Sequence, residues 1–182
     1  ESLDAVVREC HARTALEHLS AGEAEIGVIR FRSEYRDYFA EQTTERALSF
    51  ELLNKYRYQL VMHRSHALAQ RRSVLRQELD GLPEIVHGDV FRVPGKPEEA
   101  VKRKIYSVDR LSQLTLLERI PGAYMWSPGM PQHCLDRWTL VQTPCADNQN
   151  YYMDALVYNL QYSMSEIETA YVQFVREKIK QF

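Results

Sequence analysis

The feature that most constrains the fold is an amphipathic segment that runs, after a single glycine, into an almost continuous apolar stretch. In "ALEHLSAGEAEIGVI", Leu16 and Leu19 lie four and seven residues after Ala12, which stands just before this stretch. This spacing makes one helical face apolar. Gly22 can take the left-handed conformation that ends a helix. The stretch "EIGVIRF" that follows is typical of a strand covered on both faces. A helix that leads directly into such a strand indicates an α/β fold.

The residues before this helix extend the pattern backwards. Thr14 is followed three residues later by Glu17, which matches a capping box, worth about 1 kcal/mol at a helix amino end. The preceding "DAVVREC" has the β-branched content of a strand. We therefore expect a strand, a helix and a strand over residues 4–31, which together form one βαβ unit.

A second alternation of strands and helices follows. Helices are predicted over residues 74–79, with Ser73 as the cap, and after Asp109, with a stop at Pro121 and Gly122. The segment "FRVPGKPEEAVKR" reads as a surface loop because it carries two prolines, a glycine and mixed charge. Strands are predicted at "RYQLVMH", "PEIVHGD", "RKIYSVD", "AYMW", "RWTLVQT" and "MDALVYNLQY".

The last predicted element is a helix near the carboxyl end of the sequence. Ser165 and Glu168 match a second capping box, so this helix should begin at about residue 165. Its apolar positions fall on one face, because their spacing follows the helical period. These positions are Ile167, Tyr171, Phe174 and Val175.

Charge and hydropathy exclude two classes of binding surface. The chain has 23 Lys and Arg against 25 Asp and Glu, and nucleic-acid binding needs an excess of clustered basic residues. No apolar run approaches the roughly 20 residues that cross a bilayer, so no membrane partner is expected. Cys10, Cys134 and Cys145 are odd in number and have no CxxC spacing, so reduced thiols and a cytoplasmic location are expected.

No catalytic or metal-binding pattern accompanies these elements. Cys10 and His11 are adjacent, but two candidate ligands without a second spaced pair fall short of a zinc site. A catalytic Cys–His pair would need further partners, and the sequence has no nucleophile elbow, phosphate loop or paired-carboxylate signature. We expect neither an enzyme nor a bound metal or cofactor.

The order of these segments resembles the effector-binding domain of LysR-type transcriptional regulators. The resemblance rests on "ALEHLSAGEAEIGVI", then "LVMHRSHALAQ", then "LRQELDGLPEI", and later on "SVDRLSQLTLLERIPGAYMWSP" and the final helix. It spans essentially the whole chain. Two departures are Ala24-Glu25 after the helix-ending glycine and Ala67, which replaces the proline usual in "HPLA".

The resemblance implies an α/β fold with two lobes, like that of type 2 periplasmic binding proteins, in which each lobe is a mostly parallel sheet flanked by helices. Lobe I would comprise residues 1–60 and 136–182, and lobe II residues 61–135. Family members begin with a winged helix-turn-helix and with a first strand and helix of lobe I. Because residue 1 is Glu, we expect these parts to lie upstream.

The implied function is ligand sensing by a cytoplasmic regulator. A small-molecule effector would bind between the lobes and shift the arrangement of a homodimer or homotetramer, while DNA would be bound only through the upstream domain. The alternative is a solute-binding protein of a transporter, which shares the fold but carries an export signal or lipid anchor. The upstream sequence distinguishes the two.

Two turns at helix amino ends are the candidate ligand contacts, because free N–H groups and the helix dipole favour anions there. The turn "SVDRLSQ" supplies Asp109, Arg110 and Ser112, although capping alone explains them equally well. In "ECHART", the alternative is that Thr14 only caps, Arg13 is solvated and Cys10 packs as a small apolar residue. The contacts predicted from that turn are Cys10, His11, Arg13 and Thr14.

A third candidate is the segment "MHRSHA", which we predict to lie near a crossover between the lobes. His63 and Ser65 would then line the ligand cleft. A solvated histidine is the commoner outcome for such a position. Across the candidate turns, we expect the ligand to be a small carboxylate or a similar anion.

Overall fold

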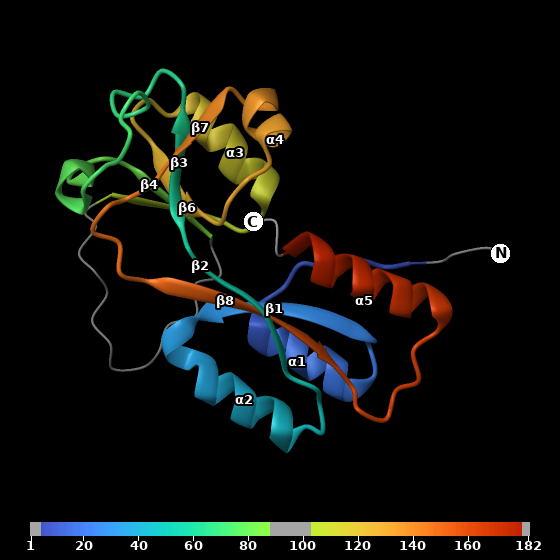
Figure 1. Cartoon of the computed structure of the whole chain (residues 1–182). Helices are drawn as coiled ribbons and strands as arrows, with labels where there is room; N and C mark the ends of the chain where they lie inside the picture. Colours follow the sequence, from blue (N-terminus) through green and yellow to red (C-terminus); the bar gives the residue numbers. More distant parts are fainter. Residues whose placement is uncertain (1–4, 88–102, 180–182) are drawn as a thin grey trace. The chain divides into compact units, whose positions relative to one another are not determined.

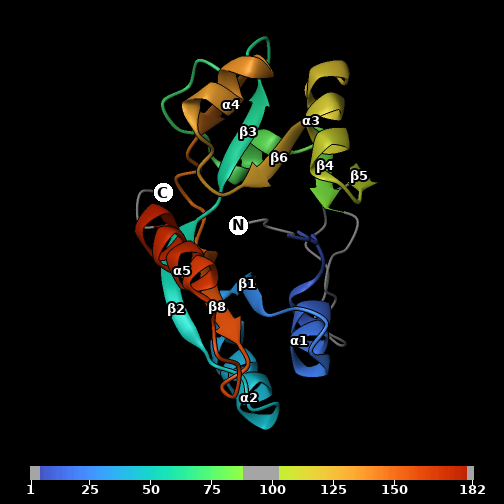
Figure 2. The same ribbon diagram turned by 90° about the vertical axis from the view of Figure 1, so that its right-hand side faces the viewer.

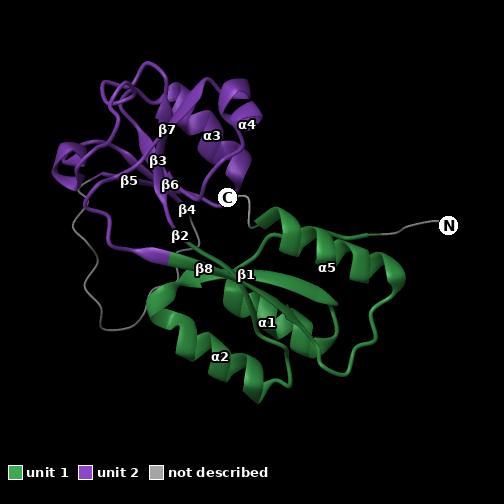
Figure 3. Ribbon diagram, in the orientation of Figure 1, with its two compact units in different colours: residues 1–55, 152–181 green, residues 56–151, 182 purple. Residues whose placement is uncertain are grey.

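The computed structural model describes residues 5–87 and 103–179, which form two compact units (Figures 1 and 3). Unit 1 contains the described residues up to Lys55 and those from Tyr152 onward. Unit 2 contains the described residues between Tyr56 and Tyr151. None of the described helices is long and apolar enough to span a membrane.

Unit 1 is a three-stranded sheet with helices on both faces. The sheet has the strand order β1-β8-β2, and β1 runs antiparallel to β8 with Ile29 opposite Ala155. Figure 1 shows α1 and α2 on one face of this sheet and α5 on the other. The elements are α1 (Ala12–Ala21), β1 (Ile26–Arg32), the 3-10 helix η1 (Ser33–Tyr35), α2 (Arg36–Glu45), β2 (Glu51–Arg57), β8 (Tyr151–Tyr158) and α5 (Glu166–Ile179).

The core of unit 1 lies between its sheet and the helices α1 and α2. Alternate residues of β1 and β8 point to this side because side chains alternate along a strand. Burial of each large apolar side chain contributes about 1.5–3 kcal/mol. The buried cluster is Leu16, Leu19, Ile29, Phe31, Phe39, Leu48, Met153, Ala155 and Val157.

Unit 2 is a five-stranded sheet with the strand order β5-β4-β6-β3-β7. Strand β4 is parallel to β5 and β6, whereas β3 is antiparallel to β6 and β7. Buried clusters cover both faces of the sheet. The elements are β3 (Gln59–His63), the 3-10 helix η2 (Arg76–Leu79), β4 (Glu84–His87), β5 (Lys104–Ser107), α3 (Arg110–Arg119), β6 (Tyr124–Ser127), α4 (Gln132–Arg137) and β7 (Leu140–Thr143).

Strand directions differ from the mostly parallel sheets that we predicted. In unit 1 the pair β1 and β8 is antiparallel, and in unit 2 the interior strand β3 runs against its two neighbours. The reason is chain connectivity, because β8 brings the chain back from unit 2, and β3 directly follows β2, the strand in which the chain enters unit 2. The other four strands of unit 2 share one direction.

The end of α1 is predicted correctly and its beginning is not. Gly22 follows the helix with φ 72°, in the left-handed region, and its N–H donates to the carbonyls of the last turn. The helix begins at Ala12, with His11 at the N-cap position and no side-chain cap bond. The predicted capping box at Thr14 is therefore wrong, because Thr14 already lies inside the first turn.

The strand predicted over residues 4–10 does not form. Residues 5–10 have no regular structure and are exposed, so the expected βαβ unit is reduced to a helix and a strand. Val6 and Val7 in this segment are 78% and 95% exposed, and the segment pairs with no described strand. A β-branched sequence needs a neighbouring strand before its propensity has an effect.

Two further predictions need correction, and a third falls almost wholly outside the described residues. Residues 74–79 form a bridge at Val74 and the 3-10 helix η2 instead of an α-helix, and the Ser73 hydroxyl donates to the Pro144 carbonyl. The second boundary lies after Tyr151, not at residue 136, because β7 pairs with β3 of unit 2. The loop predicted over residues 91–103 lies outside the described residues except for Arg103.

The helix α5 begins as predicted but buries a different face. Ser165 and Glu168 exchange hydrogen bonds, which confirms the capping box. Val172 is the buried residue of this helix, whereas Ile167, Tyr171 and Phe174 are 46%, 52% and 55% exposed. The apolar face that the spacing predicted therefore points away from the sheet.

The two capping boxes give a direct test of these helix ends. Ser165→Ala should lower the free energy of unfolding by about 1 kcal/mol, because it removes a working cap. Thr14→Ala should change it by less than about 0.5 kcal/mol, because Thr14 caps nothing. Urea denaturation of both variants beside the parent makes the comparison. A larger loss for Thr14→Ala than for Ser165→Ala would show that the sequence-based helix start was right.

Candidate functional site

Three strands of unit 2 end on polar residues at the same edge of the sheet. Strands β4, β5 and β6 are parallel, and their last residues are His87, Ser107 and Ser127. His87 lies opposite Ser107, and Ser127 lies opposite Gln59, the first residue of β3. In open α/β sheets ligands bind at the carboxyl ends of parallel strands. This edge is therefore the candidate site of unit 2.

The amino end of α3 lies directly after β5 at this edge. Asp109 is the N-cap residue, and its Oδ1 accepts the backbone N–H of Ser112 at 2.7 Å, as the sequence predicted. Hydrogen bonding from the Ser112 side chain and backbone holds the pKa of the Asp109 carboxyl below its usual range. The carboxylate is thus ionised at neutral pH and engaged with its own helix.

Arg110 is half-buried and turned toward the sheet. Its Nη1 lies 3.9 Å from the Sδ atom of Met125, in the middle of β6. The structure therefore brings together Asp109, Arg110 and Ser112, the three residues predicted from this turn, with the polar strand ends. The cation of Arg110 and the N–H groups of the first turn are the groups here that favour an anion.

Gln113 also belongs to this site, and it was not predicted from the sequence. It is 2% exposed, and its Nε2 donates to the Ser107 carbonyl at 3.3 Å, which fixes the amide at the end of β5. Its Oε1 is buried without a hydrogen-bond partner. Leaving an acceptor unsatisfied costs about 1–3 kcal/mol. The signal in the sequence is a polar residue one position before Leu114, beside the apolar positions that α3 buries.

The turn predicted from "ECHART" lies in unit 1. Cys10 and Arg13 are exposed, and Thr14 is half-buried inside the first turn of α1. The carbonyl of His11 accepts the N–H of Ala15 at 2.8 Å, which closes that turn. A ligand role for these residues stays a prediction.

His63 and Ser65 lie at the opposite end of their strand from the expected place. His63 is the last residue of β3 and pairs with Leu140, whereas the chain enters unit 2 near Gln59 at the other end. The expectation that they lie near a crossover is therefore wrong. The sequence pattern of β3 identified the strand, but it did not show which end of the strand lies where the chain enters unit 2.

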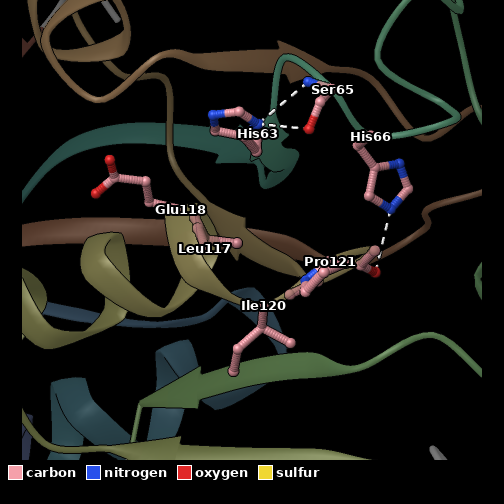
Figure 4. Close-up of a pocket in the computed structure, with 9 residues that line it drawn as sticks. His63, Ser65, His66, Leu117, Glu118, Ile120 and Pro121 are labelled. Atoms are coloured by element: carbon pink, nitrogen blue, oxygen red, sulfur yellow. Dashed lines mark hydrogen bonds between the residues drawn. The ribbon is translucent and has the colours of Figure 1, made fainter.

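A small pocket does lie at this far end, between the turn after β3 and the turn after α3 (Figure 4). Its volume is about 110 Å³, below the roughly 300 Å³ where small-molecule sites begin. The Nδ1 of His63 accepts the backbone N–H of Ser65 at 3.2 Å and lies 2.7 Å from its hydroxyl. The polar groups here are bonded within the turn, so this pocket is not the candidate ligand site.

His66 joins the two turns that form this pocket. Its Nδ1 accepts the N–H of Leu68 at 3.0 Å, so its Nε2 carries the proton and donates to the Gly122 carbonyl at 3.2 Å. Burial lowers the pKa of His66, and the bond to Gly122 opposes this effect only in part. The fold therefore requires the neutral imidazole.

The cysteines and acidic residues offer little reactive chemistry in the described part of the chain. All three cysteines are free thiols, and burial raises the pKa of Cys145 to about 11. The Sγ of Cys145 donates to Asp147 at 3.1 Å. Among residues 5–87 and 103–179, no three His, Cys, Asp or Glu side chains gather as metal ligands.

Comparison with solved structures identifies the fold. The effector-binding domain of QuiR in complex with shikimate matches with a TM-score of 0.63 and 13% identity, over 94% of this chain and 79% of that chain. The BenM effector-binding domain with its effector benzoate matches with a TM-score of 0.58 and 15% identity, over 94% and 78%. HinK, a LysR family transcriptional regulator from Pseudomonas aeruginosa, matches with a TM-score of 0.62 and 14% identity, over 94% and 58%.

These matches confirm the predicted fold class and the resemblance on which it rested. The structure has the fold of LysR-type effector-binding domains, the type 2 periplasmic-binding-protein-like fold. No protein-family model and no curated protein sequence matches the chain. At 13–15% identity, the likeness establishes the fold and leaves the ligand to be inferred from the site.

The neutral state of His66 makes stability depend on pH. In the folded state the pKa of His66 is lowered from its usual value of about 6.5. The stability that the neutral imidazole provides is therefore complete above that pH and is lost as the pH falls below it. Urea denaturation at pH 7.5 and pH 5.5 should show a smaller free energy of unfolding at pH 5.5. Each unit by which the pKa is lowered corresponds to about 1.4 kcal/mol.

His66→Asn is the matched variant, because an amide can accept from Leu68 without becoming charged. The parent should lose more stability than this variant between the two pH values. The same control at an exposed histidine, His133→Asn, should leave the parent's pH dependence unchanged. Equal pH dependence of the parent and His66→Asn would show that His66 is not the group responsible.

Proposed function

We propose that this chain is the ligand-sensing domain of a LysR-type transcriptional regulator. The observation that carries the proposal is its fold, shared over 94% of the chain with solved effector-binding domains such as those of QuiR and BenM. The polar strand ends of unit 2 supply the matching chemistry, because they gather hydrogen-bonding groups at the edge where such sheets bind ligands.

The ligand that this edge favours is a small carboxylate or similar anion. The first-turn N–H groups of α3 and the guanidinium of Arg110 provide positive potential. Asp109 would repel an anion, but its charge is engaged by Ser112. Shikimate in the QuiR structure and benzoate in the BenM structure are both carboxylates. A hydroxyl on the ligand would also find an acceptor in the Oε1 of Gln113.

The regulatory part of the proposal extends beyond the described residues. DNA binding is assigned to a domain outside this chain, since the sequence has a net charge of −2 and no basic cluster. Association into a homodimer or homotetramer, and contact of one ligand with both predicted turns, stay predictions. The balance of basic and acidic residues supports the assignment of DNA binding to another domain, because a sensing domain alone needs no excess positive charge.

Calorimetry with a panel of small organic acids tests the ligand chemistry. Arg110→Ala should weaken binding of the acid that binds the parent by roughly tenfold to a hundredfold, because a charge-assisted hydrogen bond contributes about 1.5–3 kcal/mol. Arg119→Ala removes the same charge from the exposed opposite end of α3 and should leave the affinity unchanged.

Two outcomes would contradict the proposal. If Arg110→Ala binds as tightly as the parent, or if Arg119→Ala weakens binding equally, the amino end of α3 is not the ligand site. An export signal or lipid-anchor signal in the gene upstream of residue 1 would instead favour the alternative, a solute-binding protein of a transporter. A helix-turn-helix at that place would support the regulator.

A further inference from the structure

Gln113 presents a buried acceptor near the amino end of α3. The Nε2 of Gln113 donates to the Ser107 carbonyl at 3.3 Å, whereas no group in the described part of the chain donates to its Oε1. The first bond fixes the orientation of the amide, because turning the group over would place two acceptor oxygens against each other. Oε1 is therefore the acceptor that is left over, and the bond to Ser107 holds it in place.

This amide lies at the edge of the sheet where β5 ends. The helix α3 packs against β4 and β5 (Figure 2), and its long side chains point back toward its amino end, as is usual in α-helices. The Gln113 amide follows this rule, because it reaches Ser107, the last residue of β5. Arg110 precedes Gln113 by three residues, so the two side chains are neighbours on one face of the helix. The acceptor of Gln113 and the cation of Arg110 therefore lie at the same edge.

The polar groups around Gln113 direct their hydrogen bonds elsewhere. The hydroxyl of Ser107 donates to the carbonyl of Asp109 at 3.4 Å. The guanidinium of Arg110 donates to the Sδ atom of Met125 at 3.9 Å, and a thioether is a weak acceptor that a carboxylate readily replaces. A ligand at this edge therefore meets a cation that favours an anion and, beside it, an acceptor that needs a donor.

A carboxylate alone does not match both groups, because an ionised carboxylate accepts hydrogen bonds and donates none. We propose that the ligand of unit 2 is a hydroxy acid, in which a hydroxyl close to the carboxylate donates to the Oε1 of Gln113. A hydroxyl fits better than an ammonium group, because the cation of Arg110 repels a second cation. This proposal rests on the proposed function, since it assigns specificity at the same site.

Gln113 is then the residue that distinguishes hydroxylated acids from analogues that lack the hydroxyl. The hydroxyl exchanges its bond to water for a bond to a buried acceptor, so the net gain is that of one neutral hydrogen bond. Such a bond changes an affinity by roughly threefold to tenfold. Arg110 acts on every member of a series of acids, because each of them carries the carboxylate. The two residues therefore have separable effects on binding.

Calorimetry with matched sets of acids tests the role of Gln113. Each set shares one carbon skeleton and carries a hydroxyl, an ammonium group or neither: lactate, alanine and propionate; malate, aspartate and succinate; mandelate, phenylglycine and phenylacetate. The parent should bind the hydroxylated member most tightly. In Gln113→Met, which removes the acceptor, the affinity ratio of the hydroxylated to the unsubstituted acid should fall by roughly threefold to tenfold. Gln77→Met, the same substitution at an exposed position on η2, should keep the ratio of the parent.

The side-chain NH₂ resonances of Gln113 give a second readout, which needs no variant to fold. Saturation of the parent with the hydroxylated acid should shift these resonances more than saturation with the unsubstituted acid. Equal affinity for the two acids, tighter binding of the ammonium member, or an unchanged ratio in Gln113→Met would overturn the role of Gln113 and leave the proposed function in place. If no acid binds, or if Arg110→Ala leaves every affinity unchanged, the proposed function fails and this proposal fails with it.

Discussion

Each unit is organised around a buried interior strand that runs against a neighbour. Such strands are largely apolar on both faces, because helices or loops cover both sides of the sheet. In unit 2 this strand is β3, the first strand that lies wholly in that unit, and in unit 1 it is β8, which contains the second boundary between the units. Their fully buried residues are Leu60, Val61 and Met62 in β3 and Ala155, Leu156 and Val157 in β8, all 0% exposed.

The direction of β3 determines where chemistry is possible in unit 2. Because β3 runs one way and β4, β5 and β6 the other, their carboxyl ends meet at one edge beside the start of β3. At the far edge, His63 is bonded within its own turn, and His66 joins that turn to the carbonyl of Gly122. At the near edge, Arg110 lies half-buried beside Met125, and the buried Oε1 of Gln113 has no hydrogen-bond partner. The two ends of the sheet therefore differ in how their polar groups are bonded.

Structural features that depend on neighbouring residues were predicted well from the sequence, whereas features that depend on distant partners were not. The strands of unit 2, the cap at Asp109 and the stop at Gly22 all rest on neighbouring residues, and the structure confirms them. Residues 5–10, the buried face of α5 and the position of His63 depend on which segment packs alongside. Gln113 was missed because its burial comes from the end of β5, which is not visible in the periodicity of α3.

The most direct test is to map a bound carboxylate onto the residues of unit 2 by NMR chemical shifts. A panel of organic acids is titrated into the labelled protein, and the acid that shifts any resonance is followed to saturation. We expect the largest shifts on Ser107 to Gln113 and on Ser127, with the turn from His63 to His66 unchanged. Largest shifts at the His63 to His66 turn, or none at the amino end of α3, would contradict this expectation.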